Sequence, residues 1–129
     1  MTHPNEELLR KGYDAFSKGD MGTLRDLFDP NIKWHEPGKN PIFGDYNGVD
    51  DVFGFFGQIA ERSGGTFNLE IHDIIANDTH GVVLATERGE RNGKKLDNKN
   101  VHVWHIQNGK TTEFWAQRSD QYAADEFWS

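Results

Sequence analysis

The sequence contains no cysteine and no apolar run long enough to span a membrane. The missing cysteine excludes a disulfide framework and a thiol nucleophile, and without a long apolar run there is no reason to expect a membrane protein. The polar start, Met1–Arg10, also lacks the apolar core of a secretory signal. We therefore expect a cytoplasmic protein.

Basic residues are outnumbered in this chain. There are 14 Lys and Arg against 21 Asp and Glu, which gives a formal net charge of −7. Nucleic acids and anionic membrane surfaces repel such a charge, so we expect neither as a partner. His102 and His105 form an H-x-x-H, but on a strand they point to opposite faces, so we expect no metal site there.

Aromatic side chains, in contrast, are plentiful and make up 12% of the 129 residues. The length fits one domain over residues 1–129. Aromatic side chains can line a pocket as well as fill a core. The composition therefore favours a single domain with a small-molecule ligand.

The first half of the chain has helical periodicity. Apolar residues at helical spacing predict a helix over residues 6–18, a short helix after Asp20, and a third over residues 50–62. Asn5 and Asp20 are the expected N-caps of the first two helices.

From residue 67 onward, apolar and polar residues alternate instead, as in half-buried strands. Strands are predicted at 32–36, 67–71, 82–90, 96–106 and 112–118. Asn92-Gly93 and Asn108-Gly109 are hairpin turns, because both turn positions need positive φ. Helices followed by a meander of strands indicate an α+β domain with a mainly antiparallel sheet.

The two hairpins also predict the strand register. Val82 should face Val103, and Val103 should face Phe114, if both loops have two residues. One sheet face then collects apolar side chains and should meet the helices: Val82, Leu84, Val101, Val103, Phe114 and Ala116. The other face carries Val83, His102, Trp104 and Trp115, a patch that suits a homodimer contact.

Several short motifs occur in a familiar order. These are Tyr13-x-x-Phe16-x-x-Gly19-Asp20, Leu27-Phe28, Trp34-His35-Glu36-Pro37-Gly38, and Gly109-Lys110 followed by Trp115 and Asp120. Over nearly the whole chain this order resembles the SnoaL-like, ketosteroid-isomerase-like group of the nuclear-transport-factor-2-like superfamily. The resemblance implies a cone-shaped α+β fold, with helices on a curved sheet that encloses a pocket. It does not imply one activity, because this fold hosts isomerases, cyclases, epoxide hydrolases and binders.

The resemblance to ketosteroid isomerases concerns the short strand. There an aspartate before a proline shuttles the proton, and Glu36 before Pro37 falls on that position. The oxyanion hole of those enzymes needs a tyrosine and a protonated aspartate. Tyr13 is one residue from the tyrosine position, and the acid position falls near Asn100 or Val101.

Two other chemistries point to the late strands. In limonene-type epoxide hydrolases an Arg-x-Asp works with a last aspartate to activate water and protonate the epoxide. Arg88-Gly89-Glu90 resembles the first element, and the spacing from Trp115 to Asp120 matches the second. In SnoaL-type polyketide cyclases a late aspartate abstracts a proton alpha to a carbonyl, and Asp120 is the candidate.

We therefore expect Glu36 as the base, Asp120 as a second acid or base, and Arg88 beside it. The register places Arg88, Asp97 and Asp120 in one row that faces the helices. The simpler alternatives are that Asp120 caps a tail helix and that Arg88 is a surface charge. Glu36 would then be a solvated strand-end carboxylate.

The pocket is expected to be lined by Tyr13, Phe16, Trp34, Phe53, Phe56, Leu84, Val101, Val103, Phe114 and Arg118. Glu36 and Trp34 should share the inward face of their strand, and His35 should point away. The main hypothesis is a cofactor-independent isomerase or cyclase that moves protons on a small apolar or carbonyl-bearing substrate. The alternatives are a limonene-type epoxide hydrolase and a non-catalytic ligand-binding or dimerisation module.

Overall fold

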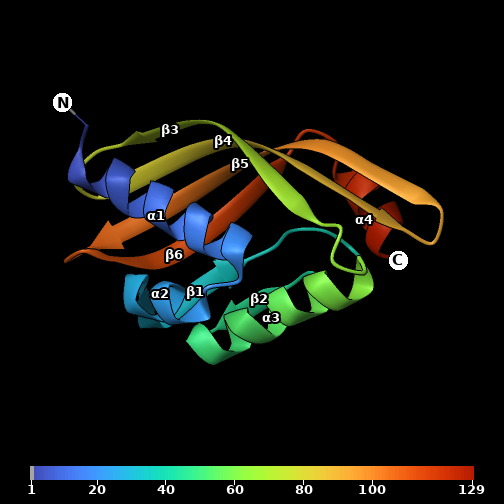
Figure 1. Ribbon diagram of the computed structural model, residues 1–129, viewed down its shortest axis with the longest axis horizontal. Helices are drawn as coiled ribbons and strands as arrows, with labels where there is room; N and C mark the ends of the chain where they lie inside the picture. The colour runs from blue at the N-terminus through green and yellow to red at the C-terminus, as the bar shows by residue number, and fades with distance from the viewer. Residues whose placement is uncertain (1) are drawn as a thin grey trace.

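A computed structural model describes residues 2–129 (Figure 1). The elements follow in the order α1 (Pro4–Lys18), α2 (Met21–Leu27), β1 (Phe28–His35), β2 (Asp45–Asn47), α3 (Val49–Arg62), β3 (Asn68–Ala76), β4 (His80–Arg91), β5 (Lys94–Gln107), β6 (Lys110–Arg118) and α4 (Gln121–Trp128). The six strands form one sheet in the order β2-β1-β6-β5-β4-β3, antiparallel except where β1 pairs with β6. The predicted α+β class and cone-like architecture are confirmed.

The helices gather on the concave side of the sheet. Figure 1 shows α1 running beside the sheet, α2 and α3 below it, and α4 under the far end of the β4–β5 hairpin. Gly81 on β4 lets α1 pack closely against the sheet, because a Cβ at this position would overlap Cδ1 of Leu9 on α1. None of the helices in residues 2–129 combines the length and apolarity that crossing a membrane requires.

Short-range signals fix the ends of the first two helices. α1 begins with Pro4, and its N-cap is His3, whose ring accepts a hydrogen bond from the Asn5 backbone at 3.0 Å. The predicted cap, Asn5, lies inside the helix instead, because proline suits the first helical position. Asp20 caps α2 as predicted, since its side chain accepts from the backbone N–H of Thr23 at 3.1 Å.

The β4–β5 register agrees with the prediction. Val82 pairs with Val103, and Arg88 pairs with Asp97. The turn between the strands has φ of 51° at Asn92, and the next turn has φ of 54° at Asn108. Both two-residue hairpins therefore form as their Asn-Gly sequences predict.

The β5–β6 register differs from the prediction by one residue. A bulge between His105 and Ile106 shifts the pairing, so that Val103 faces Trp115 and Trp104 faces Phe114. Because side chains alternate along a strand, this one-residue shift puts Trp104, not Val103, on the face of Phe114.

Because of this shift, two groups of residues lie on the opposite face of the sheet from the one predicted from the sequence. Leu84, Val101 and Val103, expected in the pocket, lie half-buried on the convex face of the sheet. Val83, His102 and Trp104, expected on the dimer face, are buried on the concave side, with exposed fractions of 0%, 5% and 5%. Trp115 alone of that predicted patch lies on the convex face.

Candidate functional site

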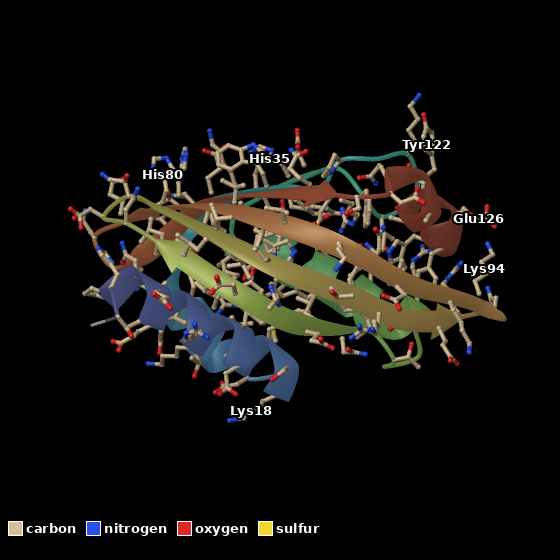
Figure 2. All side chains as sticks on the ribbon, turned by 90° about the horizontal axis from the view of Figure 1, so that it is seen from above. Lys18, His35, His80, Lys94, Tyr122 and Glu126 are labelled. Atoms are coloured by element: carbon tan, nitrogen blue, oxygen red, sulfur yellow. The ribbon has the colours of Figure 1, made fainter. Side chains whose placement is uncertain are left out.

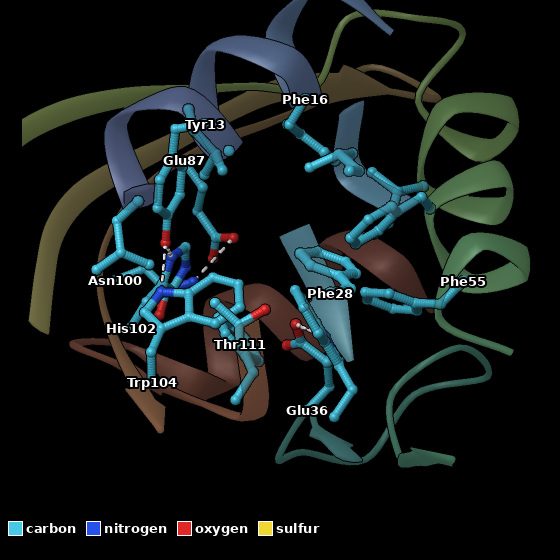
Figure 3. Close-up of a pocket in the computed structure, with 18 of the residues that line it drawn as sticks. Tyr13, Phe16, Phe28, Glu36, Phe55, Glu87, Asn100, His102, Trp104 and Thr111 are labelled. Carbon is cyan, nitrogen blue, oxygen red and sulfur yellow. Dashed lines mark hydrogen bonds between the residues drawn. The ribbon is translucent and has the colours of Figure 1, made fainter. Parts of the chain in front are cut away.

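The concave side of the sheet and helices α1 to α3 enclose a cavity, called the chamber below. The space between its lining atoms is about 740 Å³ when the open solvent at its mouth is included. Aromatic side chains form a large part of the wall, several of them labelled in Figure 3. They are Tyr13, Phe16, Phe28, Trp34, Phe55, Phe56, Phe67, Trp104, Phe114 and Trp128. Of the residues predicted to line the pocket, Tyr13, Phe16, Trp34, Phe56, Phe114 and Arg118 do so. Phe53 packs behind the wall against Phe28 and Phe56.

Three charged side chains meet in the chamber wall, and we call them the acid–arginine cluster: Glu36, Glu87 and Arg118. Nη2 of Arg118 donates to Oε2 of Glu36 at 2.9 Å, and Nε of Arg118 donates to Oε1 of Glu87 at 2.6 Å. The side chains are 5%, 1% and 4% exposed in that order. Figure 3 shows the carboxyl ends of Glu36 and Glu87 converging on the interior from different walls.

The cluster has one more acid than base. Burial alone would lower the pKa of Arg118, but the two carboxylates have the larger, opposite effect. The pKa of Arg118 is therefore raised, and the guanidinium stays charged. Burial raises the pKa of Glu87, because desolvation outweighs the opposing charge of Arg118. Ionisation of both acids would leave a net negative charge in an apolar wall. Glu87 is therefore the group that is poised to hold a proton.

The two carboxyls differ in how tightly their oxygens are held. Oε1 of Glu36 accepts from the indole N–H of Trp34 at 3.1 Å, and its Oε2 is bound to Arg118. Oε2 of Glu87 has only long contacts, 3.5 Å from Nδ2 of Asn100 and 3.4 Å from Arg118. Glu87 thus offers the freer oxygen atom.

The strand alternation predicted around Glu36 is confirmed. Glu36 and Trp34 are 7% and 5% exposed and line the chamber. His35 points away from the chamber and bonds Asp45 at 2.8 Å and Glu113 at 2.7 Å. Burial alone would lower the pKa of His35, but these two carboxylates have the larger, opposite effect, so the pKa of His35 is raised. Figure 2 shows His35 on the side of the sheet opposite α1.

A second polar group in the chamber joins α1 to β5. The Tyr13 hydroxyl lies 2.5 Å from Nδ1 of His102 and accepts from the indole N–H of Trp104 at 3.1 Å (Figure 3). Burial, and to a lesser degree the charge of Arg118, lowers the pKa of His102 to about 3. Burial raises the pKa of Tyr13 above its ordinary value. Both side chains are therefore uncharged at neutral pH.

Some polar atoms of the wall are buried without a partner among the described residues. They are Oδ1 of Asn100, Oγ1 of Thr111, Nη1 of Arg118 and Nε1 of Trp128. Buried donors and acceptors in folded proteins are nearly always paired. These atoms are available for a polar ligand or water.

Asp120 and Arg88 do not reach the chamber, and the predicted row of Arg88, Asp97 and Asp120 is wrong. The exposed Asp120 caps α4, accepting from the backbone N–H of Ala123 at 3.0 Å, and its backbone pairs with the Asn98 side chain. Arg88 lies on the convex face, where it bonds Glu70 and lies 3.7 Å from Asp97. The bulge in β5–β6 separates Asp120 from Asp97, because it shifts every later pair by one residue.

Sequence reasoning missed Glu87 and His102 as chamber residues, and it named Asn100 only as a position near the acid of the ketosteroid-isomerase oxyanion hole. The signal available was that Asn100 and His102 share their strand parity with the large apolar Leu96, Trp104 and Ile106. That parity mixes polar and apolar residues, which is the pattern of a polar chamber rather than a solid core. Residues 2–129 contain no group of three His, Cys, Asp or Glu side chains placed to hold a metal ion.

Comparison with known proteins agrees with this architecture. The sequence model of the SnoaL-like domain family matches residues 9–114. An uncharacterised protein of Mycobacterium tuberculosis is 31% identical over 125 residues, which cover 95% of each chain. The solved structure of Bal32a, from a soil-derived mobile gene cassette, has 38% identity and a TM-score of 0.94 over 98% of this chain and 97% of its own. An NTF2-like protein of unknown function from Burkholderia pseudomallei shares the fold, with 24% identity and a TM-score of 0.88 over 99% of both chains.

Proposed function

The chain belongs to the SnoaL-like domain family, and from that premise we propose that it is a cofactor-independent enzyme that moves a proton on a small, largely apolar, carbonyl-bearing substrate. The observation that carries the proposal is the acid–arginine cluster, in which two buried carboxyls share one guanidinium inside an aromatic wall. Burial in such an environment raises the pKa of Glu87, which suits a carboxyl that binds and releases a proton.

Glu87 is the proposed base. Its carboxylate takes a proton from the carbon alpha to the substrate carbonyl, and the C–H electron pair moves to give an enolate. Arg118, which is fixed by both glutamates, stabilises the charge that develops nearby. Return of the proton from Glu87 to another carbon of a conjugated enolate completes an isomerisation. Attack of the enolate carbon on a second carbonyl of the substrate instead closes a ring, and the alkoxide that forms takes the proton from Glu87.

Glu36, the base expected from the sequence, takes a different part in this proposal. Trp34 and Arg118 each donate a hydrogen bond to one of its two oxygens, so neither oxygen is free to face the substrate. Its role is to hold Arg118 in place and keep the guanidinium charged. Asp120 and Arg88 have no part, because they lie outside the chamber.

The test is exchange of acidic C–H protons in D₂O, followed by NMR on small apolar ketones such as 2-tetralone. The protein should accelerate deuterium uptake above the buffer rate, and Glu87→Gln should lose about a hundredfold of that rate or more. The matched control is Glu90→Gln, an exposed glutamate on the same strand, which should exchange like wild type. Wild-type exchange in Glu87→Gln would remove Glu87 as the base. Absence of exchange for every ketone would favour the binding module.

A second activity is supported by the same cluster. One protonated and one ionised carboxyl on a shared arginine can protonate an epoxide oxygen and activate a water, as in limonene-type epoxide hydrolases. Formation of a diol from limonene oxide, with ¹⁸O incorporated from labelled water, would favour this activity over proton exchange.

A further inference from the structure

Two nitrogen atoms lie within hydrogen-bonding distance of the Tyr13 hydroxyl, and they cannot both be hydrogen-bond donors. The Trp104 indole nitrogen is a donor only, so it donates to the Tyr13 oxygen at 3.1 Å. The phenol proton then has one acceptor, Nδ1 of His102 at 2.5 Å. If His102 also donated, the phenol proton would be buried without an acceptor, which folded proteins rarely tolerate.

This network fixes the tautomer of His102. Because Nδ1 accepts from Tyr13, the single proton of the neutral ring lies on Nε2. The neutral state agrees with the low pKa of about 3 that burial and Arg118 give this ring. Nε2 has no hydrogen-bond partner within residues 2–129, although His102 belongs to the chamber wall.

We infer that the Nε2–H group of His102 is the donor that binds the oxygen atom of the chamber's ligand, with Tyr13 as the residue that positions it. The Tyr13 hydroxyl is not itself the donor to the ligand, because its proton is committed to His102. The inference rests on the proposed function, in which that oxygen is the substrate carbonyl.

The position of His102 also restricts the ligand. Asn100, which contacts the Glu87 carboxyl, lies two residues before His102 on the same face of β5. Two residues along a strand span about 7 Å. A ketone that reaches both groups has its oxygen at His102 and its acidic C–H toward Glu87, and its apolar body lies against the aromatic wall. The structure thus favours compact ketones with fused or attached rings.

The tautomer is tested by NMR on protein with ¹⁵N-labelled histidine. At pH 7, His102 should carry its proton on Nε2, with an unprotonated Nδ1. Tyr13→Phe, which removes only the hydroxyl, should shift the Nδ1 resonance of His102, because that nitrogen loses its hydrogen bond. An Nδ1–H tautomer or a doubly protonated ring in the wild-type protein would overturn the inference.

The ligand contact is tested by comparing 2-tetralone with tetralin, the hydrocarbon that lacks only the oxygen. Wild-type protein should bind 2-tetralone about five- to tenfold more tightly, as expected for one hydrogen bond. His102→Phe, which keeps a ring without a donor, should lose that ratio. His102→Gln, whose amide N–H replaces Nε2–H, should keep part of it, and His105→Gln on the convex face should keep all of it.

An unchanged ratio in His102→Phe, or no preference in the wild type, would overturn the inference. If His102→Phe does not fold, as judged by circular dichroism, Tyr13→Phe decides the matter, because it should reduce the same ratio. Failure of the proposed function looks different. In that case 2-tetralone is preferred through His102, but its protons do not exchange.

Discussion

At the scale of single residues, the chamber is defined by groups whose charge state burial decides. Glu87 is drawn toward the protonated state, His102 toward the neutral state, and Arg118 remains charged between two carboxyls. A buried ion pair adds little net stability, because desolvation offsets the attraction. The presence of such a cluster in a wall of aromatic side chains is therefore better explained by chemistry than by stability.

The lowered pKa of His102 predicts how stability depends on pH. Below about pH 6.5 the unfolded chain binds a proton at this ring while the folded chain does not, so stability falls as the pH drops toward about 3. His102→Gln should remove that loss. Relative to wild type, its unfolding free energy should rise by up to about 1.4 kcal/mol for each pH unit below 6.5. Urea unfolding at pH 4.5, 5.5 and 7 measures the difference.

His35 provides the matched contrast, because its pKa is raised in the folded protein by Asp45 and Glu113. Its contribution is present below the unfolded pKa and is lost as pH rises through the folded pKa. His35→Gln should therefore lose stability at low pH and approach wild type at high pH, the opposite sign to His102→Gln. Parallel pH profiles for the two variants would contradict the assigned environments.

At the scale of secondary structure elements, the sequence predicts what local patterns determine. Helical periodicity, the cap at Asp20 and the two Asn-Gly turns are local signals, and the structure confirms each of them. The bulge in β5–β6 is not local in this sense. It places Thr111 and Thr112 against Ile106, and neither threonine differs in kind from a regular strand residue.

The single extra residue in the β5–β6 bulge therefore made part of the expected site wrong. The wrong register linked Val103 to Phe114 and sent His102 and Trp104 to the outer face. Glu36 was located correctly, because its position depends only on alternation within β1. To place Glu87 in the chamber, one must know which face of β4 meets the helices. That assignment depended on the β5–β6 register. Site residues that are set by one strand could be predicted, and those set by pairing across the bulge could not.

The cap of α4 gives a prediction at this scale. Asp120→Ala removes the acceptor for the Ala123 N–H and should cost about 1 kcal/mol, while Asp120→Asn should retain most of the cap. Neither variant should change the rate of ketone proton exchange, because Asp120 lies outside the chamber. Thermal unfolding and the exchange assay together check both statements. If the Asp120→Ala variant folds but no longer exchanges ketone protons, Asp120 has a catalytic role after all.

At the scale of the whole molecule, the sheet has two faces with separate properties. The concave face holds the chamber and its charged groups, and the convex face carries half-buried apolar side chains. The corrected register makes that convex patch continuous: Val82, Val103 and Trp115 form one row, and Leu84 and Val101 form the next. A net charge of −7 opposes self-association, so a contact would have to rely on this apolar patch.

We propose that two copies of the chain associate through the convex face. This patch consists of different residues from the one expected from the sequence, with only Trp115 in common. The variants that test the contact are therefore chosen from the convex patch. Val103→Glu combined with Trp115→Glu places buried charges in the contact and should give a monomer by light scattering at micromolar concentration. Tyr122→Glu is the matched control, because Tyr122 is 89% exposed on α4 and projects away from the sheet in Figure 2. The control should keep the wild-type mass. A wild-type protein that is already monomeric at this concentration would rule out the contact, and the apolar row would then need another explanation.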